Sequence, residues 1–219
     1  MRKATLLLMF VVLVAAFSAC HLGKGVQGSG NRKSEKRNLA AFKAIDTTGA
    51  YEVEVTCQKP ASFEIETDDN ILPLIKTEVR DGVLYVTSEE SYNPSRTVAL
   101  RISLPELTAV SSRGAGQILV QDAKSDDLKI DSNGAASIKA NGKVKSTSIS
   151  SSGAGEIDAS RLQAEKARVT VAGAASVNVY ASEQLDVTIS GVGKVNYSGN
   201  PKIVNKQVSG FGSVNKTEE

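Results

Sequence analysis

Ser112-Arg113-Gly114-Ala115-Gly116-Gln117-Ile118 is the first of six similar heptapeptides in the second half of the chain. The other five begin at residues 132, 151, 171, 189 and 208, so that consecutive copies lie 18 to 20 residues apart. A fixed period of this size indicates one structural unit that stacks on copies of itself. Every copy has glycine at its third position: Gly114, Gly134, Gly153, Gly173, Gly191 and Gly210.

The residues around these glycines alternate between apolar and polar. Ile or Val stands four positions after each glycine, and also four positions before it in every copy except the last, which has Lys206. The residues three positions after the glycines are polar: Gln117, Ser137, Glu156, Ser176, Lys194 and Ser213. A period of two is typical of a β-strand with one buried face. Each copy is therefore predicted to be a strand, a glycine bend and a second strand, with the residue directly after the glycine at the corner.

Twenty residues cannot bury their apolar face alone, but stacked coils can. At roughly 3.3 Å per residue the perimeter of a coil is about 65 Å, which suits a slim, three-sided cross-section. Connections between parallel strands are right-handed by strong preference. We therefore predict an all-β fold, a right-handed parallel β-helix that is a single-stranded solenoid with about 20 residues per coil. Leucine-rich repeats and the calcium-binding nonapeptide roll fit less well, because the copies lack their signature residues.

Residues 28–107 are rich in strand patterns but lack the glycine period, and we expect them to form an irregular N-terminal cap on the solenoid. Phe63–Thr67 and Val83–Val86 read as strands, and Asp81-Gly82 reads as a turn. With the glycine-repeat coils at 108–216, residues 28–219 are predicted to be one domain. At the far end, Lys206, Lys216, Thr217, Glu218 and Glu219 predict a polar last coil.

The first nineteen residues have the features of a secretory signal: two basic residues, an apolar run and small residues before Cys20. Phe17-Ser18-Ala19-Cys20 resembles the cleavage site of bacterial lipoproteins, in which the cysteine is acylated. The alternative is an ordinary signal peptide cleaved near Ala19. We expect 1–19 to be the lipoprotein signal, Cys20 the lipidated residue that anchors the chain to a membrane, and 20–27 a tether. A basic cluster follows, which would contact anionic lipid headgroups or be a solvated linker: Lys24, Arg32, Lys33, Lys36 and Arg37.

Charge and composition restrict the partners. Without Arg2 and Lys3 the chain has 24 basic and 24 acidic residues, and this balance argues against nucleic acid as a partner. The single histidine, His21, lies in the tether. Cys57 is in phase with Val53 and Val55 and is expected to be a small core residue.

The order of several segments resembles the bacterial head GIN domain family, which is described as an adhesin family of unknown function. The matching segments run from Gly28-Ser29-Gly30-Asn31 through Phe42–Ile45, Gly49–Val53 and Asp81–Leu84 to Leu107 and the six glycine units. The resemblance implies a right-handed β-helix in the envelope of a diderm bacterium. Together with Cys20 it predicts an outer-membrane lipoprotein whose domain faces either the periplasm or the outside of the cell. It supplies no catalytic residues.

An enzyme is the alternative function, because β-helices also build polysaccharide lyases and hydrolases. Such chemistry needs facing carboxylates, and the internal acidic pairs are Asp68-Asp69 and Asp126-Asp127, each beside a turn. The first residues to test as catalytic would be Asp126, Asp127 and Asp131, with Arg113 or Lys129 as the basic group. Adjacent strand residues face opposite sides, which argues against either pair as a catalytic site. Because the folded region also has no histidine, one cysteine and no carboxylate cluster at ligand spacing, we assign no catalytic residue, no metal and no cofactor.

A non-enzymatic binding module, an adhesin, is therefore the predicted function. Its ligand would be a glycan or an envelope protein, bound by a polar column on the outward face; a structural or envelope-stress component that binds a protein through an end coil is a third reading. Candidate aromatic residues for stacking on sugars are Tyr180, Tyr197 and Phe211, although Tyr197 has inward parity. The predicted outward column comprises Ser111, Asp131, Ser150, Thr170, Thr188 and Gln207.

Overall fold

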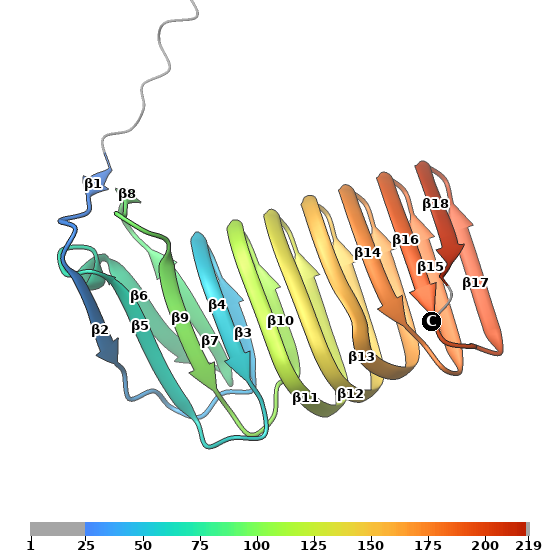
Figure 1. The fold of residues 1–219 in the computed structure, drawn as a ribbon, viewed down its shortest axis with the longest axis horizontal. Coiled ribbons are helices and arrows are strands. Elements are labelled where there is room, and N and C mark those ends of the chain that lie inside the picture. The colour runs from blue at the N-terminus through green and yellow to red at the C-terminus, as the bar shows by residue number, and fades with distance from the viewer. Residues whose placement is uncertain (1–24, 218–219) are drawn as a thin grey trace, which may run out of the picture.

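The computed structural model describes residues 25–217, which form an elongated stack of β-coils with its irregular end at the N-terminus (Figure 1). The lipidation candidate Cys20 and the signal segment lie outside the described residues. Within 25–217 the only helical element is the short 3-10 helix η2 (Leu72–Leu74). Among these residues, no helix has the length and apolar character needed to cross a membrane.

The repeat coils pair in parallel and in the register that the glycine period predicts. In the first three coils a single strand runs around nearly the whole coil: β11 (Ala115–Ser132), β12 (Ala135–Ser151) and β13 (Ala154–Val171). Ile118 pairs with Ile138, and Ile138 with Ile157. The next two coils divide into two strands each, β14 (Ala174–Tyr180) with β15 (Gln184–Ile189) and β16 (Val192–Ser198) with β17 (Ile203–Val208), and β18 (Phe211–Lys216) ends the stack.

The cross-section has two long sides and one short side. The long sides are continuous ladders, for example 115–120 on 135–140 and 127–132 on 146–151. Between them the register shifts after Val120, and only Ala123 to Ser125 pair on the short side. The β-helix is confirmed, and the expected third side is reduced to a narrow bend.

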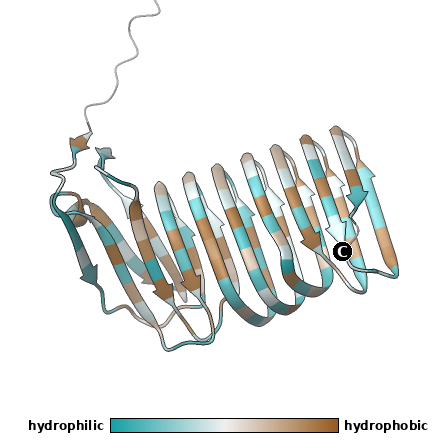
Figure 2. Ribbon diagram, in the orientation of Figure 1, coloured by the Kyte–Doolittle hydropathy of each residue, from teal (hydrophilic) through white to brown (hydrophobic). Residues whose placement is uncertain are grey.

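The alternating pattern in the sequence becomes alternating burial in the structure. The column four positions after the glycines is at most 3% exposed from Ile118 to Val195, and the column four positions before them is at most 2% exposed from Val110 to Val187. Figure 2 shows the result as alternating hydrophobic and hydrophilic bands along each strand. The inward and outward faces were thus assigned correctly from the period of two.

The six glycines stack directly on one another, and the structure adds a seventh at the cap, Gly49. A Cβ atom on Gly114 would lie less than 3.0 Å from the carbonyl oxygen of Gly49, and the same collision recurs at every later glycine of the column. The same carbonyl oxygen accepts a hydrogen bond from the residue that follows the stacked glycine: Ala135 N, directly after Gly134, donates to Gly114 O at 2.8 Å. Glycine is required here because the backbones of neighbouring coils are too close for a side chain.

The cap continues both long sides of the solenoid. On one side β10 (Ala109–Ser112) pairs with β3 (Ala44–Thr47), which pairs with β7 (Val83–Ser88), and β6 (Ile75–Arg80) closes the sheet in antiparallel orientation. On the other, β11 pairs with β4 (Ala50–Thr56) and β4 with β9 (Val98–Ser103), followed by antiparallel β5 (Ser62–Asp68) and β2 (Arg32–Lys36). The small pair β1 (Val26–Gln27) and β8 (Tyr92–Asn93) lies beside it.

Individual polar contacts secure the cap. The buried carboxylate of Asp68 accepts hydrogen bonds from Gly30 N (2.8 Å), Ser95 N (2.8 Å) and Ser95 Oγ (2.6 Å), and so joins three separate segments. Arg37 donates to the carbonyl oxygens of Leu72 and Ile75 and pairs with Glu35. Arg37, a member of the basic cluster for which lipid contact or a solvated linker was expected, is therefore used inside the cap.

The last coil is less polar than its sequence suggested. Three large apolar side chains are exposed there, Phe211 (87% exposed), Ile203 (51%) and Val208 (43%). Val192 in the preceding coil is 60% exposed. The expectation of a polar end was incomplete, because Lys206, Lys216 and Thr217 are exposed but so is Val208, whose column is buried in earlier coils and is not covered by a coil here. Lys206 stands in the other inward column, and its ammonium lies 5.2 Å from the centre of the Tyr197 ring.

Candidate functional site

The predicted outward column forms one continuous ladder along a long side of the solenoid, and we call it the ladder face. Register places each of its members beside the next, from Ser111 to Gln207. The cap extends the column by two residues that the sequence analysis missed, Asp46 on β3 and Tyr85 on β7. Neighbouring strands lie about 4.8 Å apart, so the face offers hydroxyl, carboxylate and amide groups at that repeat.

Charge is concentrated where the ladder face meets the cap. Arg113 donates to Asp46 Oδ2 at 2.5 Å, and Lys129 lies 2.8 Å from Asp131. The other oxygen of Asp46 is buried without a hydrogen-bond partner among the described residues. Burial raises the pKa of Asp46, Arg113 opposes this shift, and Asp131 adds to it. Toward the C-terminus the ladder becomes neutral, so its two ends present different chemistry.

The opposite long side carries an asparagine ladder that the sequence analysis did not identify. Asn178, Asn196 and Asn215 are stacked in register, and Asn196 Nδ2 donates to Asn178 Oδ1 at 2.9 Å. Their common signal was present in the sequence, because all three lie five positions after a repeat glycine. The bond between Asn196 and Asn178 stabilises the stack, whereas Asn215 Nδ2 donates to Ser213 Oγ at 3.2 Å.

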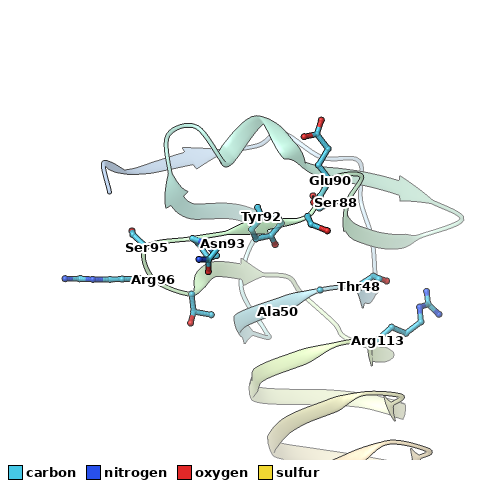
Figure 3. A pocket seen from close by; sticks show the side chains of 13 residues that line it. Thr48, Ala50, Ser88, Glu90, Tyr92, Asn93, Ser95, Arg96 and Arg113 are labelled. Carbon is cyan, nitrogen blue, oxygen red and sulfur yellow. The ribbon is translucent and has the colours of Figure 1, made fainter. Parts of the chain in front are cut away.

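A groove of about 790 Å³ lies between the cap and the first glycine bend (Figure 3). Thr48, Ala50, Ser88 and Tyr92 line it, whereas the side chains of Glu90 and Arg96 extend away from its centre. Tyr51, beside it, is 2% exposed, and its hydroxyl has no partner among the described residues. Burial raises the pKa of Tyr51 and of Tyr92. The loop residues that build this groove belong to no repeat, so periodicity could not indicate them.

The carboxylates considered for catalysis do not converge. Asp68 is bonded inside the cap, and its neighbour Asp69 accepts a hydrogen bond from Ser29. Asp126 forms an ion pair with Lys145 at 2.8 Å, and Asp127 accepts a bond from Ser146. Asp131 lies four residues further along β11, about 13 Å from Asp127.

The second groove, of about 880 Å³, runs along the short side and has mixed charge, with Lys124, Lys143, Lys145, Asp126 and Glu165 among its lining residues. Within 25–217, no group of three or more histidine, cysteine or acidic residues is arranged to hold a metal ion. Neither this groove nor the one at the cap brings together two free carboxylates proposed from the sequence. Of the candidate acids and bases, the structure brings together Asp131 and Lys129, which form a partly exposed ion pair on the ladder face and not in either groove.

The aromatic candidates are dispersed. Tyr197 is 8% exposed, as its parity predicted, Tyr180 is half-buried, and Phe211 is almost fully exposed at the last coil. Cys57 is 1% exposed, and burial raises the pKa of its thiol to about 11. These residues do not form a common stacking platform for a sugar.

Several solved structures share the fold. A structure described as a putative adhesin from Bacteroides fragilis is 22% identical, with a TM-score of 0.72 over 88% of this chain and 100% of that one. A putative lipid binding protein from Parabacteroides distasonis is 22% identical, with a TM-score of 0.54 over 88% and 99%. A putative adhesin from Parabacteroides merdae is 20% identical, with a TM-score of 0.55 over 88% and 99%.

No curated protein matches the chain. A family model described as "Putative auto-transporter adhesin, head GIN domain" matches residues 41–201, which span most of the cap and all but the last coil. The chain therefore belongs to the head GIN domain family.

Proposed function

We propose that this protein is a non-catalytic binding module, an adhesin of the bacterial cell envelope, whose ladder face binds a glycan or a protein. The family consists of adhesin-like proteins, which suggests a cell-envelope or surface location. The observation that supports binding by this face is its register: six repeat-coil positions and two cap positions lie side by side without interruption. Short polar side chains at a regular spacing suit many weak hydrogen bonds to an extended partner.

Lysine substitutions on the ladder face test this proposal. Ser150→Lys with Thr170→Lys would place two long charged side chains in the middle of the face, where the native residues are half-buried. Binding to a glycan array, or recovery of an envelope protein, should fall at least tenfold relative to the unmodified chain. The array and the co-purification identify which class of partner is bound.

The matched control carries the same change on the opposite long side. Ser137→Lys with Ser176→Lys alters two half-buried residues, one in the coil of Ser150 and one in the coil after that of Thr170. This variant should bind as the unmodified chain does. Equal loss in both variants would show that the ladder face has no special role, and degradation of the glycan would favour the enzyme alternative.

The proposed anchor is acylation of Cys20, which would make the protein an outer-membrane lipoprotein. The support is sequence only: an apolar run that ends in Ala19-Cys20. Labelled fatty acid supplied to expressing cells should enter the unmodified chain and not Cys20→Ala. Equal labelling of the two would contradict lipidation, and protease treatment of intact cells would show which side of the membrane the domain faces.

A further inference from the structure

The C-terminal end of the solenoid exposes apolar side chains of a size found nowhere else on the described surface. The four large exposed apolar residues of 25–217, Val192, Ile203, Val208 and Phe211, all lie in the last two coils. Val192 and Phe211 continue the corner position that alanine occupies from Ala50 to Ala174, so small side chains give way to large ones only at this end. We call these four residues, with the lysines around them, the end patch.

The charge within the last coils is basic, although exposed Glu183 of the preceding coil lies next to Ile203. Between residues 187 and 217 there are four lysines, Lys194, Lys202, Lys206 and Lys216, and no aspartate or glutamate. Lys194 borders the same shallow hollow as Val192 and Phe211. Asp186 in the preceding coil is engaged by Asn205, Gln184 and Arg168, which lower its pKa. Glu218 and Glu219 follow in sequence and lie outside the described residues.

Protection of an open sheet edge explains only part of this arrangement. Lysine on an edge strand discourages pairing with another chain, and Lys206 in an inward column fits that role. It also makes a second copy an unfavourable partner, because two basic ends would face each other. Edge protection does not explain Phe211, which is 87% exposed and costs solubility. Exposed aliphatic and aromatic side chains among lysines are typical of proteins that insert shallowly into an anionic bilayer.

We propose that the end patch binds the surface of a membrane that contains anionic phospholipid. Phe211, Val192 and Val208 enter the boundary between headgroups and acyl chains, and the lysines contact the phosphate groups. This contact is independent of the ladder face, which lies along the side of the solenoid. Nine steps between paired strands lead from the cap edge β2 to β18, so at about 4.8 Å per step the patch lies about 43 Å from that edge.

A tryptophan at the patch reports insertion directly, because the chain contains no tryptophan. Phe211→Trp is made in the full chain with Cys20→Ala, so that no acyl group contributes. Vesicles of phosphatidylcholine with phosphatidylglycerol, carrying bromine on the acyl chains, should quench its fluorescence. Ala115→Trp occupies the equivalent corner position in the first repeat coil and should not be quenched.

Charge reversal tests the lysines by vesicle flotation. Lys194→Glu with Lys202→Glu should weaken binding to the anionic vesicles by roughly tenfold or more, since each basic residue near such a surface contributes about fivefold. Lys139→Glu with Lys143→Glu makes the same change among exposed residues of the middle coils and should leave binding unchanged. Residues 1–24 are identical in all variants, so their own affinity for lipid cancels.

Three results would overturn the proposal. Fluorescence of Phe211→Trp that is insensitive to brominated lipid would show that the patch stays in water. Equal weakening by both charge reversals would leave only general electrostatic attraction. Dimerisation in analytical ultracentrifugation that Phe211→Ser abolishes would assign the patch to a second copy. None of these outcomes depends on whether the ladder face binds a glycan or a protein.

Discussion

The repeat coils and the cap extend the same two sheets but are held together by different means. In the repeat coils each position recurs, so that one column of Ile and Val and one column of glycine serve every coil. In the cap most contacts occur once, such as the three hydrogen bonds to Asp68 and the bonds from Arg37 to η2. A substitution in a column is therefore expected to disturb few neighbours but to cost much stability. A substitution at a joining residue of the cap is expected to free several segments at once.

The largest effect is expected inside a repeat coil. Ile157→Asp places an unpaired charge in a column where the native side chain is 1% exposed, and should lower the free energy of unfolding by about 4 kcal/mol. Urea denaturation measures the loss. Glu156→Ala, one residue away and exposed, should stay within about 0.5 kcal/mol. Similar losses in the two variants would mean that the inward and outward faces are wrongly assigned.

The glycine column should be nearly as sensitive. In Gly153→Ala the new methyl group would collide with the carbonyl oxygen of Gly134, and we expect a loss of about 2 to 3 kcal/mol as neighbouring coils move apart. Gly82→Ala is the control, because a Cβ atom there has open space and only the positive φ of 74° adds strain. If Gly82→Ala proved the more damaging change, close approach would not be the reason for the glycines.

The cap should respond to acid before the middle coils β12 and β13 do. Hydrogen bonds from Ser95 and Gly30 lower the pKa of Asp68, and Arg101 and Arg32 lower the pKa of Glu66. Each carboxylate therefore stabilises the fold fully above its unfolded pKa, 3.8 or 4.5, and loses this contribution as pH falls through the lower folded value.

Hydrogen exchange at descending pH should show β2, β5 and β9 opening before β12 and β13. Asp68→Asn should make the cap open more readily already at neutral pH, and should therefore reduce the pH dependence of its opening. Asp46 acts in the opposite direction, because its pKa is raised. Simultaneous opening of all strands would contradict the assignment of acid sensitivity to the cap.

The smallest effect is expected at the open end. Lys206→Val restores the inward column but removes the contacts of Lys206 with Tyr197 and with Val214 O. The free energy of unfolding should change by no more than about 1 kcal/mol, while the unguarded edge should promote self-association. Sedimentation velocity measures the association, and a variant that remains monomeric at high concentration would remove the protective role from Lys206.

The sequence was sufficient for the repeat coils because burial there follows from a period of two and the bends from a glycine column. It was not sufficient for Gly49, the seventh member of that column, because the cap strands are inserted between it and Gly114. It also missed Asp46 and the groove beside Tyr92, which depend on segments far apart in the chain. The exposed end followed from the absence of a covering coil, which no local pattern reveals.

The central claim is that the coils stack in one register from the cap to the last strand, which makes the ladder face continuous. Spin labels at Ser111→Cys and Gln207→Cys, in a chain with Cys20→Ala, measure this by pulsed electron resonance, and buried Cys57 with its raised pKa should remain unlabelled. Five steps of about 4.8 Å predict a narrow distribution of backbone separations near 24 Å. A broad distribution, or a separation well above that value, would contradict the continuous ladder.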